Sequence, residues 1–237
     1  MENYVEFVVY GDKALFSEVF TRVGGEKRSY HVPTYEAIKG VLHSIYWKPT
    51  LIWVVDAVRV MNPIQTKTEG VLLLKGSGGK DLSYYTYLSD VKYQVRAHFE
   101  WNMNRPELER DRNFAKHMSI AQRKIMQGGR RDVFLGTREC QAYVEPCQFG
   151  EGSGFYDFVP ELSFGNMYHG ITYADEAYSK ETERKMTVRF DRITMKNGII
   201  NYTAPKNCAI TRTIKEMKIK PFGKKYSNFS NVKEEVS

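Results

Sequence analysis

The strongest constraint on the fold is an amphipathic helical segment that is enclosed by two prolines and flanked by strand-like runs. Pro33 comes just before this segment and Pro49 ends it. Its apolar side chains recur at helical spacing, at Tyr35, Ile38, Val41, Leu42 and Ile45. Residues 5–10 and 51–61 are rich in β-branched and aromatic side chains, which predicts a strand on either side. The chain is therefore expected to open with a strand, a helix and a strand.

The following segments extend this pattern. Residues 71–74 and 91–101 read as strands. A second helix is expected from Arg105-Pro106, where proline suits the first turn, to the stop at Gly128-Gly129. One arc of this helix is apolar and consists of Leu108, Phe114, Ala115, Met118, Ala121, Ile125 and Met126. Residues 133–146 supply one or two more strands. The β-α-β-β-α-β order is typical of a ferredoxin-like (RRM-like) domain, so we predict an α+β fold with that domain at residues 1–149.

The sequence pattern changes in the C-terminal part of the chain. It starts with a loop-like stretch, GEGSGFYDF, at residues 150–158. Two strand-like runs, KMTVRFDRITM and IINYTA, then flank Lys196-Asn197-Gly198, and Asn-Gly in that position is a strong hairpin signal. We predict a small, mainly β domain at residues 150–237 that ends in a basic tail.

The charge distribution indicates the class of partner. The formal net charge is +7. Residues 101–131 hold eight basic and three acidic residues, and residues 206–225 hold seven basic and one acidic residue. Two basic segments on a nearly neutral body suit a polyanion, with nucleic acid first and an anionic membrane surface second. The alternative is that these segments are solvated charged faces.

Other features bear on the cellular compartment. No apolar run approaches the roughly 20 residues of a membrane-spanning helix, and the N-terminus MENYVEF carries glutamates where a secretory signal carries lysines. The three cysteines are an odd number with no CxxC pair, which indicates neither a disulfide framework nor a zinc knuckle. We expect a cytoplasmic protein without a membrane partner.

Few residue patterns point to chemistry by themselves. The five histidines show no metal-binding spacing, so neither a metal nor another cofactor is predicted. The glycine-rich stretch at 76–80 lacks the register of a phosphate-binding loop and reads as a hairpin connection. Residues 128–131, GGRR, could clamp a phosphate or simply end a helix. Tyr46 could be a packed aromatic residue, and His117, beside Lys116, could be an ordinary half-buried histidine.

Four longer stretches carry a specific resemblance: VPTYEAIKGVLHSIYWKP, LIWVVDAVRVMN, NFAKHMSIAQRK and VFLGTRECQAYVEP. They resemble the CRISPR-associated RAMP-superfamily proteins of subtype I-C, the fifth Cas family in its d form, over most of residues 1–215. The resemblance implies a metal-independent endoribonuclease that cuts the repeat RNA of a CRISPR precursor transcript. It further implies that the protein then stays on the 5′ handle of the guide RNA, together with the other subunits of the interference complex. The tyrosine, lysine and histidine of the family's catalytic constellation correspond to Tyr46, Lys116 and His117.

These side chains fit metal-free cleavage, in which the RNA's own 2′-hydroxyl attacks phosphorus and leaves a 2′,3′-cyclic phosphate and a 5′-hydroxyl. His117 would remove the 2′ proton or protonate the leaving oxygen, and Lys116 would hold the developing charge. Tyr46 would orient the hydroxyl or donate a proton. Neighbours on a helix diverge by about 100°. We therefore infer that the helix begins late, near residues 113–117, or that Lys116 and His117 lie in a bend.

Binding to RNA is expected to depend on shape and phosphate contacts, because the aromatic signature of a base-stacking sheet is absent. The candidate phosphate contacts are basic residues: Lys48, Arg105, Arg110, Arg123, Lys124, Arg130 and Arg131. Non-specific binding to duplex DNA is a possible further activity. The alternative function is a non-catalytic scaffold subunit that binds the 5′ handle, although a purely structural subunit has no reason to keep the tyrosine and the Lys-His pair together.

Overall fold

The computed structural model describes residues 4–24, 26–74, 76 and 78–219. It is a mixed α and β fold with few helices and a mostly antiparallel sheet. The strands are β1 (Val5–Ala14), β2 (Leu51–Val60), β3 (Gln65–Leu74), β4 (Lys80–Trp101), β5 (Val133–Phe134), β6 (Gln141–Pro146), β7 (Leu162–Thr172), β8 (Lys185–Lys196), β9 (Ile199–Asn201) and β10 (Ile210–Glu216). The helices are α1 (Tyr35–Ile45) and α2 (Phe114–Met126), with 3-10 turns η1 (Thr21–Gly24), η2 (Pro106–Asp111), η3 (Ala174–Glu176) and η4 (Pro205–Asn207).

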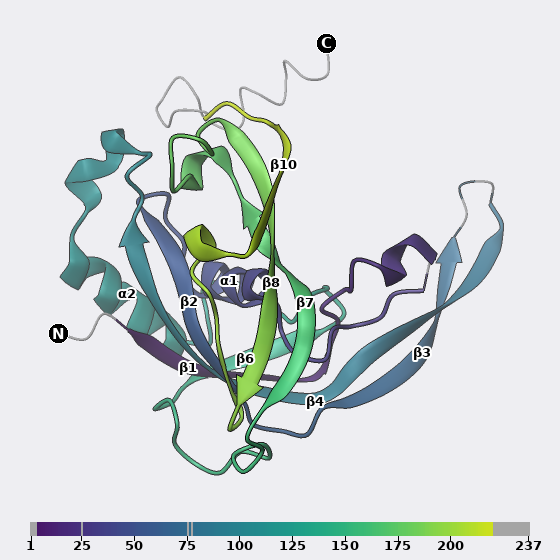
Figure 1. Cartoon of the computed structure of the whole chain (residues 1–237). Helices are drawn as coiled ribbons and strands as arrows, with labels where there is room; N and C mark the ends of the chain where they lie inside the picture. The colour runs from purple at the N-terminus through teal and green to yellow at the C-terminus, as the bar shows by residue number, and fades with distance from the viewer. Residues whose placement is uncertain (1–3, 25, 75, 77, 220–237) are drawn as a thin grey trace.

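One continuous sheet joins the N-terminal and C-terminal parts of the chain. Its order is β10-β8-β9-β2-β4-β1-β6-β5, with β3 added to β4 and β7 added to β8. The link between the two parts is the pairing of β9 with β2, and the sheet curves so that α1 lies between β2 and β7 (Figure 1). The domain boundary at 149/150 stays a prediction.

The prolines enclose α1 as the sequence predicts, and the structure adds a capping residue. The Thr34 side chain accepts a hydrogen bond from the Ala37 N–H, which caps the helix at its N-terminus. The predicted apolar face is buried against the sheet. The predicted Asn-Gly hairpin is also confirmed, because Asn197 and Gly198 both have positive φ between β8 and β9.

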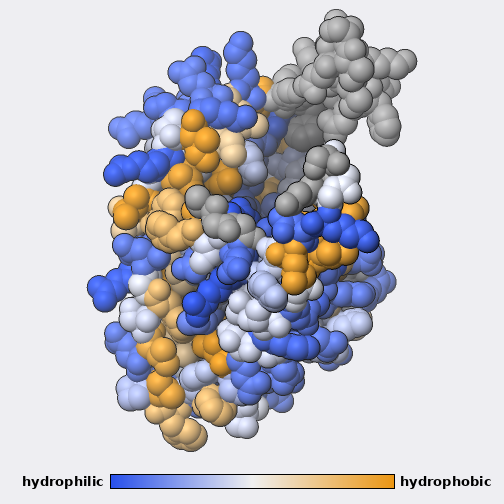
Figure 2. Space-filling model, turned by 90° about the vertical axis from the view of Figure 1, so that its right-hand side faces the viewer, coloured by the Kyte–Doolittle hydropathy of each residue, from blue (hydrophilic) through white to orange (hydrophobic). Residues whose placement is uncertain are grey.

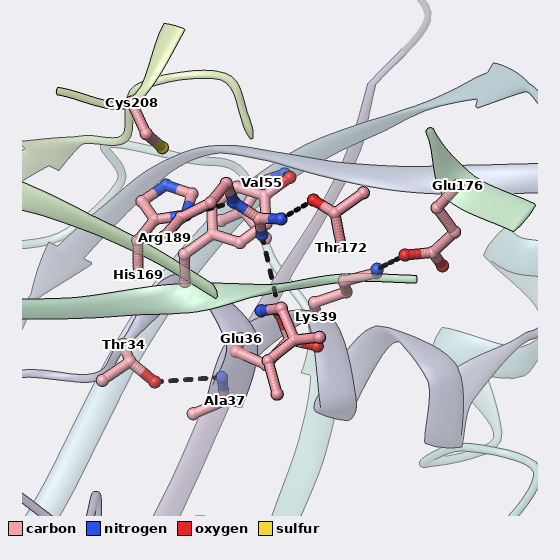
Figure 3. A network of polar contacts seen from close by, with 12 residues as sticks. Thr34, Glu36, Ala37, Lys39, Val55, His169, Thr172, Glu176, Arg189 and Cys208 are labelled. Atoms are coloured by element: carbon pink, nitrogen blue, oxygen red, sulfur yellow. Dashed lines mark hydrogen bonds and ion pairs between the residues drawn. The ribbon is translucent and has the colours of Figure 1, made fainter. Parts of the chain in front are cut away.

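A buried polar network fixes α1 against the C-terminal strands (Figure 3). Lys39 of α1 pairs with Glu176 at an N–O distance of 2.5 Å, and Arg189 of β8 lies 3.8 Å from the Glu36 carboxylate. Arg189 also donates a hydrogen bond to the Thr172 hydroxyl. Burial raises the pKa of Glu36, and Lys39 and Arg189 oppose this rise. Paired charges at these buried positions fix the orientation of α1, and therefore the position of Tyr46 at its end.

Two predicted boundaries are wrong in the β3–β4 region. β3 begins at Gln65 rather than at 71, and β4 runs for 22 residues from Lys80. The two strands form a projecting hairpin (Figure 1). β3 is largely exposed, and residues 80–89 of β4 mix exposed with buried positions, so no long apolar run marks the hairpin. The face that this hairpin turns outward carries hydrophobic residues among hydrophilic ones (Figure 2). The predicted hairpin connection is confirmed for Gly76, Gly78 and Gly79, which lie between β3 and β4, whereas Lys80 is already the first residue of β4.

The prediction of one continuous helix from Arg105-Pro106 is also wrong. The chain forms the 3-10 turn η2, breaks at Arg112 and restarts as α2, where the Asn113 side chain accepts a hydrogen bond from the Lys116 N–H. The inferred late start of the helix is therefore confirmed. Met118, Ala121 and Ile125 of the predicted arc are buried, whereas Ala115 and Met126 are exposed.

Two further predictions concern the C-terminal tail and membrane-spanning segments. The basic segment at 206–225 is described only to residue 219, and the predicted tail beyond it lies outside the described residues. Within the part of the chain that the structure covers, no helix has the length and apolar character needed to cross a membrane.

Candidate active site

Tyr46 and His117 meet between the end of α1 and the first turn of α2. Tyr46 follows α1 directly, and its carbonyl accepts a hydrogen bond of 2.7 Å from the indole N–H of Trp53. The Tyr46 hydroxyl lies 2.7 Å from Nδ1 of His117. Tyr46 is 3% exposed and His117 is 0% exposed. The two rings thus form a buried hydrogen-bonded pair.

The surroundings of His117 determine which ring nitrogen carries hydrogen. Nε2 lies 2.7 Å from the main-chain carbonyl oxygen of Asp111, which can only accept a hydrogen bond. Nε2 must therefore donate, and in the neutral ring Nδ1 accepts from the Tyr46 hydroxyl. The imidazole also packs edge-on against Phe99 and Trp101. His117 is accordingly held in one orientation and one tautomer.

Lys116 joins this pair through Asp111. Its Nζ lies 2.5 Å from Oδ1 of Asp111, and the Thr50 hydroxyl donates a hydrogen bond of 2.7 Å to Oδ2 of the same carboxylate. The Lys116 hydrogen bond is the main cause that lowers the pKa of Asp111 below its usual range. The Lys116 side chain is about half exposed, at 49%. Of the three predicted catalytic residues, Lys116 is thus the one open to solvent.

The geometry resolves the problem of two neighbouring residues on one helix. Lys116 points outward and His117 points inward, yet both reach Asp111, which precedes the N-terminus of α2. The pKa of Tyr46 depends on its burial and on two nearby charges. Burial raises its pKa, Asp111 adds to this rise, and Arg130 opposes it. A neutral tyrosine hydroxyl next to a histidine can pass a proton, whereas the ammonium can hold negative charge.

Most of the predicted RNA-binding residues lie on the surface. Lys48, Arg110, Arg123, Arg130 and Arg131 are exposed. The half-buried Lys124 donates a hydrogen bond of 2.8 Å to the Gln127 side chain.

Arg105 requires a correction. It is 4% exposed, and its guanidinium pairs with Asp175 at 3.0 Å and with Glu107 at 3.5 Å. A guanidinium enclosed in this way ties η2 to η3 and does not face an RNA phosphate.

The Gly-Gly-Arg-Arg segment at 128–131 does not offer its main-chain amides to a ligand. The N–H groups of Arg130 and Arg131 both donate to the Ser44 carbonyl of α1, and those of Gly128 and Gly129 donate to carbonyls of α2. Any phosphate contact here must come from the guanidinium groups. The segment lines an open polar cavity of about 440 Å³ together with Tyr10 and Tyr143.

Asp111 and Thr50 are the residues of the site that sequence reasoning missed. Asp111 is five residues before Lys116, a separation that places neither side chain beside the other on a regular helix. The contact arises only because the chain breaks between η2 and α2. Among the described residues, no group of three or more histidine, cysteine, aspartate or glutamate side chains could hold a metal ion.

Comparisons with known proteins identify the family of the chain. A model of the family Cas_Cas5d, described as CRISPR-associated protein (Cas_Cas5), matches residues 4–203. The chain belongs to this family of CRISPR-associated proteins.

Three relatives illustrate the likeness. A protein of Mannheimia succiniciproducens named CRISPR pre-crRNA endoribonuclease Cas5d is 26% identical over 231 residues, covering 85% of this chain and 95% of that protein. A protein of the same name from Thermus thermophilus is 29% identical over 151 residues, covering 58% of this chain and 62% of its own length. A solved structure titled as a CRISPR-associated protein is 36% identical, with a TM-score of 0.72, and the match covers 89% of this chain and 96% of that one.

Proposed function

We propose that this chain is a metal-independent endoribonuclease that cleaves CRISPR precursor RNA within the repeat to generate guide RNA. After cleavage it stays on the 5′ handle as a subunit of the subtype I-C interference complex. The family and the names of the two relatives from Mannheimia succiniciproducens and Thermus thermophilus support this function. The observation that carries the proposal is the 2.7 Å hydrogen bond between Tyr46 and His117 beside the half-exposed ammonium of Lys116.

We assign the N-terminal part to the ferredoxin-like class. The support is the order β2-β4-β1-β6 within the sheet, with α1 between β1 and β2 and α2 between β4 and β6. This is the β-α-β-β-α-β arrangement, with β3 and β5 as additional strands. A cytoplasmic location stays a prediction that rests on the three free cysteines.

Tyr46 and His117 act as one proton-transfer unit in this mechanism. Burial raises the pKa of Tyr46, so the tyrosine does not ionise by itself. It accepts the proton of the RNA 2′-hydroxyl while it passes its own proton to Nδ1 of His117. The 2′-oxygen forms its bond to phosphorus, the bond to the 5′-oxygen breaks, and the leaving oxygen takes a proton from water. General acid–base catalysis of this kind contributes typically ~10²–10⁴-fold to a rate.

Lys116 stabilises the charge that develops on the phosphate. An ammonium group has three hydrogens, so Lys116 can keep one on Asp111 and direct the others at non-bridging phosphate oxygens. The exposed arginines near α2, among them Arg123, Arg130 and Arg131, bind phosphates along the RNA. The same basic surface accounts for the possible non-specific binding of duplex DNA.

A second candidate is a non-catalytic subunit that binds the 5′ handle. The complete burial of His117, with protein partners on both ring nitrogens, favours it. Purified protein incubated with repeat RNA in EDTA separates the two functions. The endoribonuclease cuts at a single position in the repeat, and His117→Ala abolishes the cut but retains RNA binding. Tight binding without any cut by the wild-type protein supports the scaffold.

A further inference from the structure

Asp111 contacts two of the three proposed catalytic side chains directly. Its main-chain carbonyl accepts hydrogen bonds from the Asn113 N–H at 2.8 Å and from Nε2 of His117 at 2.7 Å. Its carboxylate holds the Lys116 ammonium at 2.5 Å. A single residue thus fixes the tautomer of the histidine through its backbone and the place of the lysine through its side chain.

The surroundings hold Asp111 firmly in this position. The Thr50 hydroxyl, in a residue that is 1% exposed, donates to Oδ2 and orients the carboxylate. The guanidinium of Arg112 donates hydrogen bonds to the main-chain carbonyls of Asn102 and Arg105, which ties the two ends of η2 together. The Asp111 carboxylate is therefore a fixed anchor, whereas the Lys116 side chain without it has many rotamers.

We propose that Asp111 is a positioning residue for RNA cleavage, acting through Lys116 to place the ammonium beside the scissile phosphate. The inference rests on the proposed endoribonuclease function. A carboxylate near a phosphate is unfavourable for RNA affinity, so its presence is useful only if fixing the ammonium in the transition state outweighs this repulsion. The low pKa of Asp111 means that the carboxylate is charged at neutral pH, as the ion pair requires.

Asp111→Asn isolates the contribution of the charge. The asparagine keeps the main-chain carbonyl for His117 and an oxygen for Thr50, but it loses the ion pair with Lys116. We expect the single-turnover cleavage rate at saturating protein to fall about tenfold or more. RNA affinity should be unchanged or tighter, because one negative charge is removed.

Matched variants show whether the effect passes through Lys116. Glu109→Gln removes the same charge from an exposed position of η2 and should leave the rate within about twofold of wild type. The double variant Asp111→Asn/Lys116→Ala should cleave no more slowly than Lys116→Ala alone, because the carboxylate acts only through the ammonium. Thr50→Val, nearly isosteric, frees the carboxylate without removing it and should cause a smaller loss that also disappears in the Lys116→Ala background.

The outcomes are distinct. The role of Asp111 is overturned if the rate losses of the two single variants multiply in the double variant. It is also overturned if Asp111→Asn cleaves as fast as wild type. Neither result contradicts the proposed endoribonuclease function. Loss of RNA affinity and thermal stability together with activity identifies Asp111 as a purely structural residue. If Asp111→Asn fails to fold, Thr50→Val decides by the same comparison. Wild-type protein that does not cut repeat RNA in EDTA refutes the proposed function and this inference with it.

Discussion

Removing the Tyr46 hydroxyl tests two separate contributions of this group, one to the stability of the fold and one to the rate of RNA cleavage. Tyr46→Phe keeps the ring and deletes the hydroxyl that hydrogen-bonds to Nδ1 of the fully buried His117. A buried acceptor left without its partner costs about 1–3 kcal/mol of unfolding free energy. The same substitution removes the proposed proton relay, so we expect the cleavage rate to fall by ~10²–10⁴-fold while RNA affinity changes little.

Urea denaturation gives the first quantity, and single-turnover cleavage of repeat RNA with a separate binding titration gives the second. Tyr202→Phe is the matched control, because Tyr202 is 8% exposed and its hydroxyl donates to the buried main-chain carbonyl of Pro33. The control should be destabilised to a similar extent but should cleave at the wild-type rate where it is folded. A Tyr46→Phe variant that cleaves normally would refute the proton relay, and a control that loses activity equally would show that stability alone explains the loss.

Three further predictions concern charge. RNA affinity should fall steeply with salt, because several exposed cations replace counterions on the phosphates, and an affinity independent of salt would contradict this. Arg131→Ala should weaken RNA binding without changing the melting temperature. Arg105→Ala should lower the melting temperature, because it leaves Asp175 without its ion pair. Melting curves and RNA titrations of both variants test these two expectations. The hydrogen bond that His98 donates to the Asp56 carboxylate raises the pKa of His98. The stabilisation from this contact is fully present below the ordinary pKa of histidine and is lost as the pH rises through the raised pKa. In urea titrations, His98→Ala should therefore lower the unfolding free energy more at about pH 5.5 than at about pH 8.5. An equal loss at both pH values would contradict this coupling between protonation and stability.

The elements that the sequence predicts correctly are those with local signals. α1 has a capping threonine, a proline on each side and an apolar face at helical spacing. The Asn197-Gly198 turn depends only on two residues that accept positive φ. Such features require no knowledge of the rest of the chain.

The features that escaped prediction depend on contacts between distant segments. β3 is largely exposed on a projecting hairpin, and the first half of β4 mixes exposed residues with buried ones such as Tyr85 and Tyr87. Pairing between the two strands, rather than a continuous apolar run, therefore defines them. Arg105 lies in a strongly basic segment and reads as an RNA contact, but its partner Asp175 is 70 residues away in η3. No pattern near Arg105 signals that burial.

The candidate site shows the same division. The resemblance supplied Tyr46, Lys116 and His117, and the 100° divergence of helix neighbours led to the correct inference that α2 begins late. Asp111 escaped because its contacts with Lys116 and His117 cross a break between two helical segments. Spacing rules for regular helices do not apply across such a break.

Cleavage of a repeat RNA with a single 2′-deoxy nucleotide just before the scissile phosphate, in EDTA, tests the central claim most directly. The substitution removes the proposed nucleophile and leaves nearly every contact with the protein in place. We expect the unmodified RNA to yield 2′,3′-cyclic phosphate and 5′-hydroxyl ends, and the deoxy RNA to bind with the same affinity and remain intact. A deoxy RNA that is cut at the normal rate would mean that water or a protein side chain attacks phosphorus, and it would contradict the mechanism built on Tyr46, Lys116 and His117.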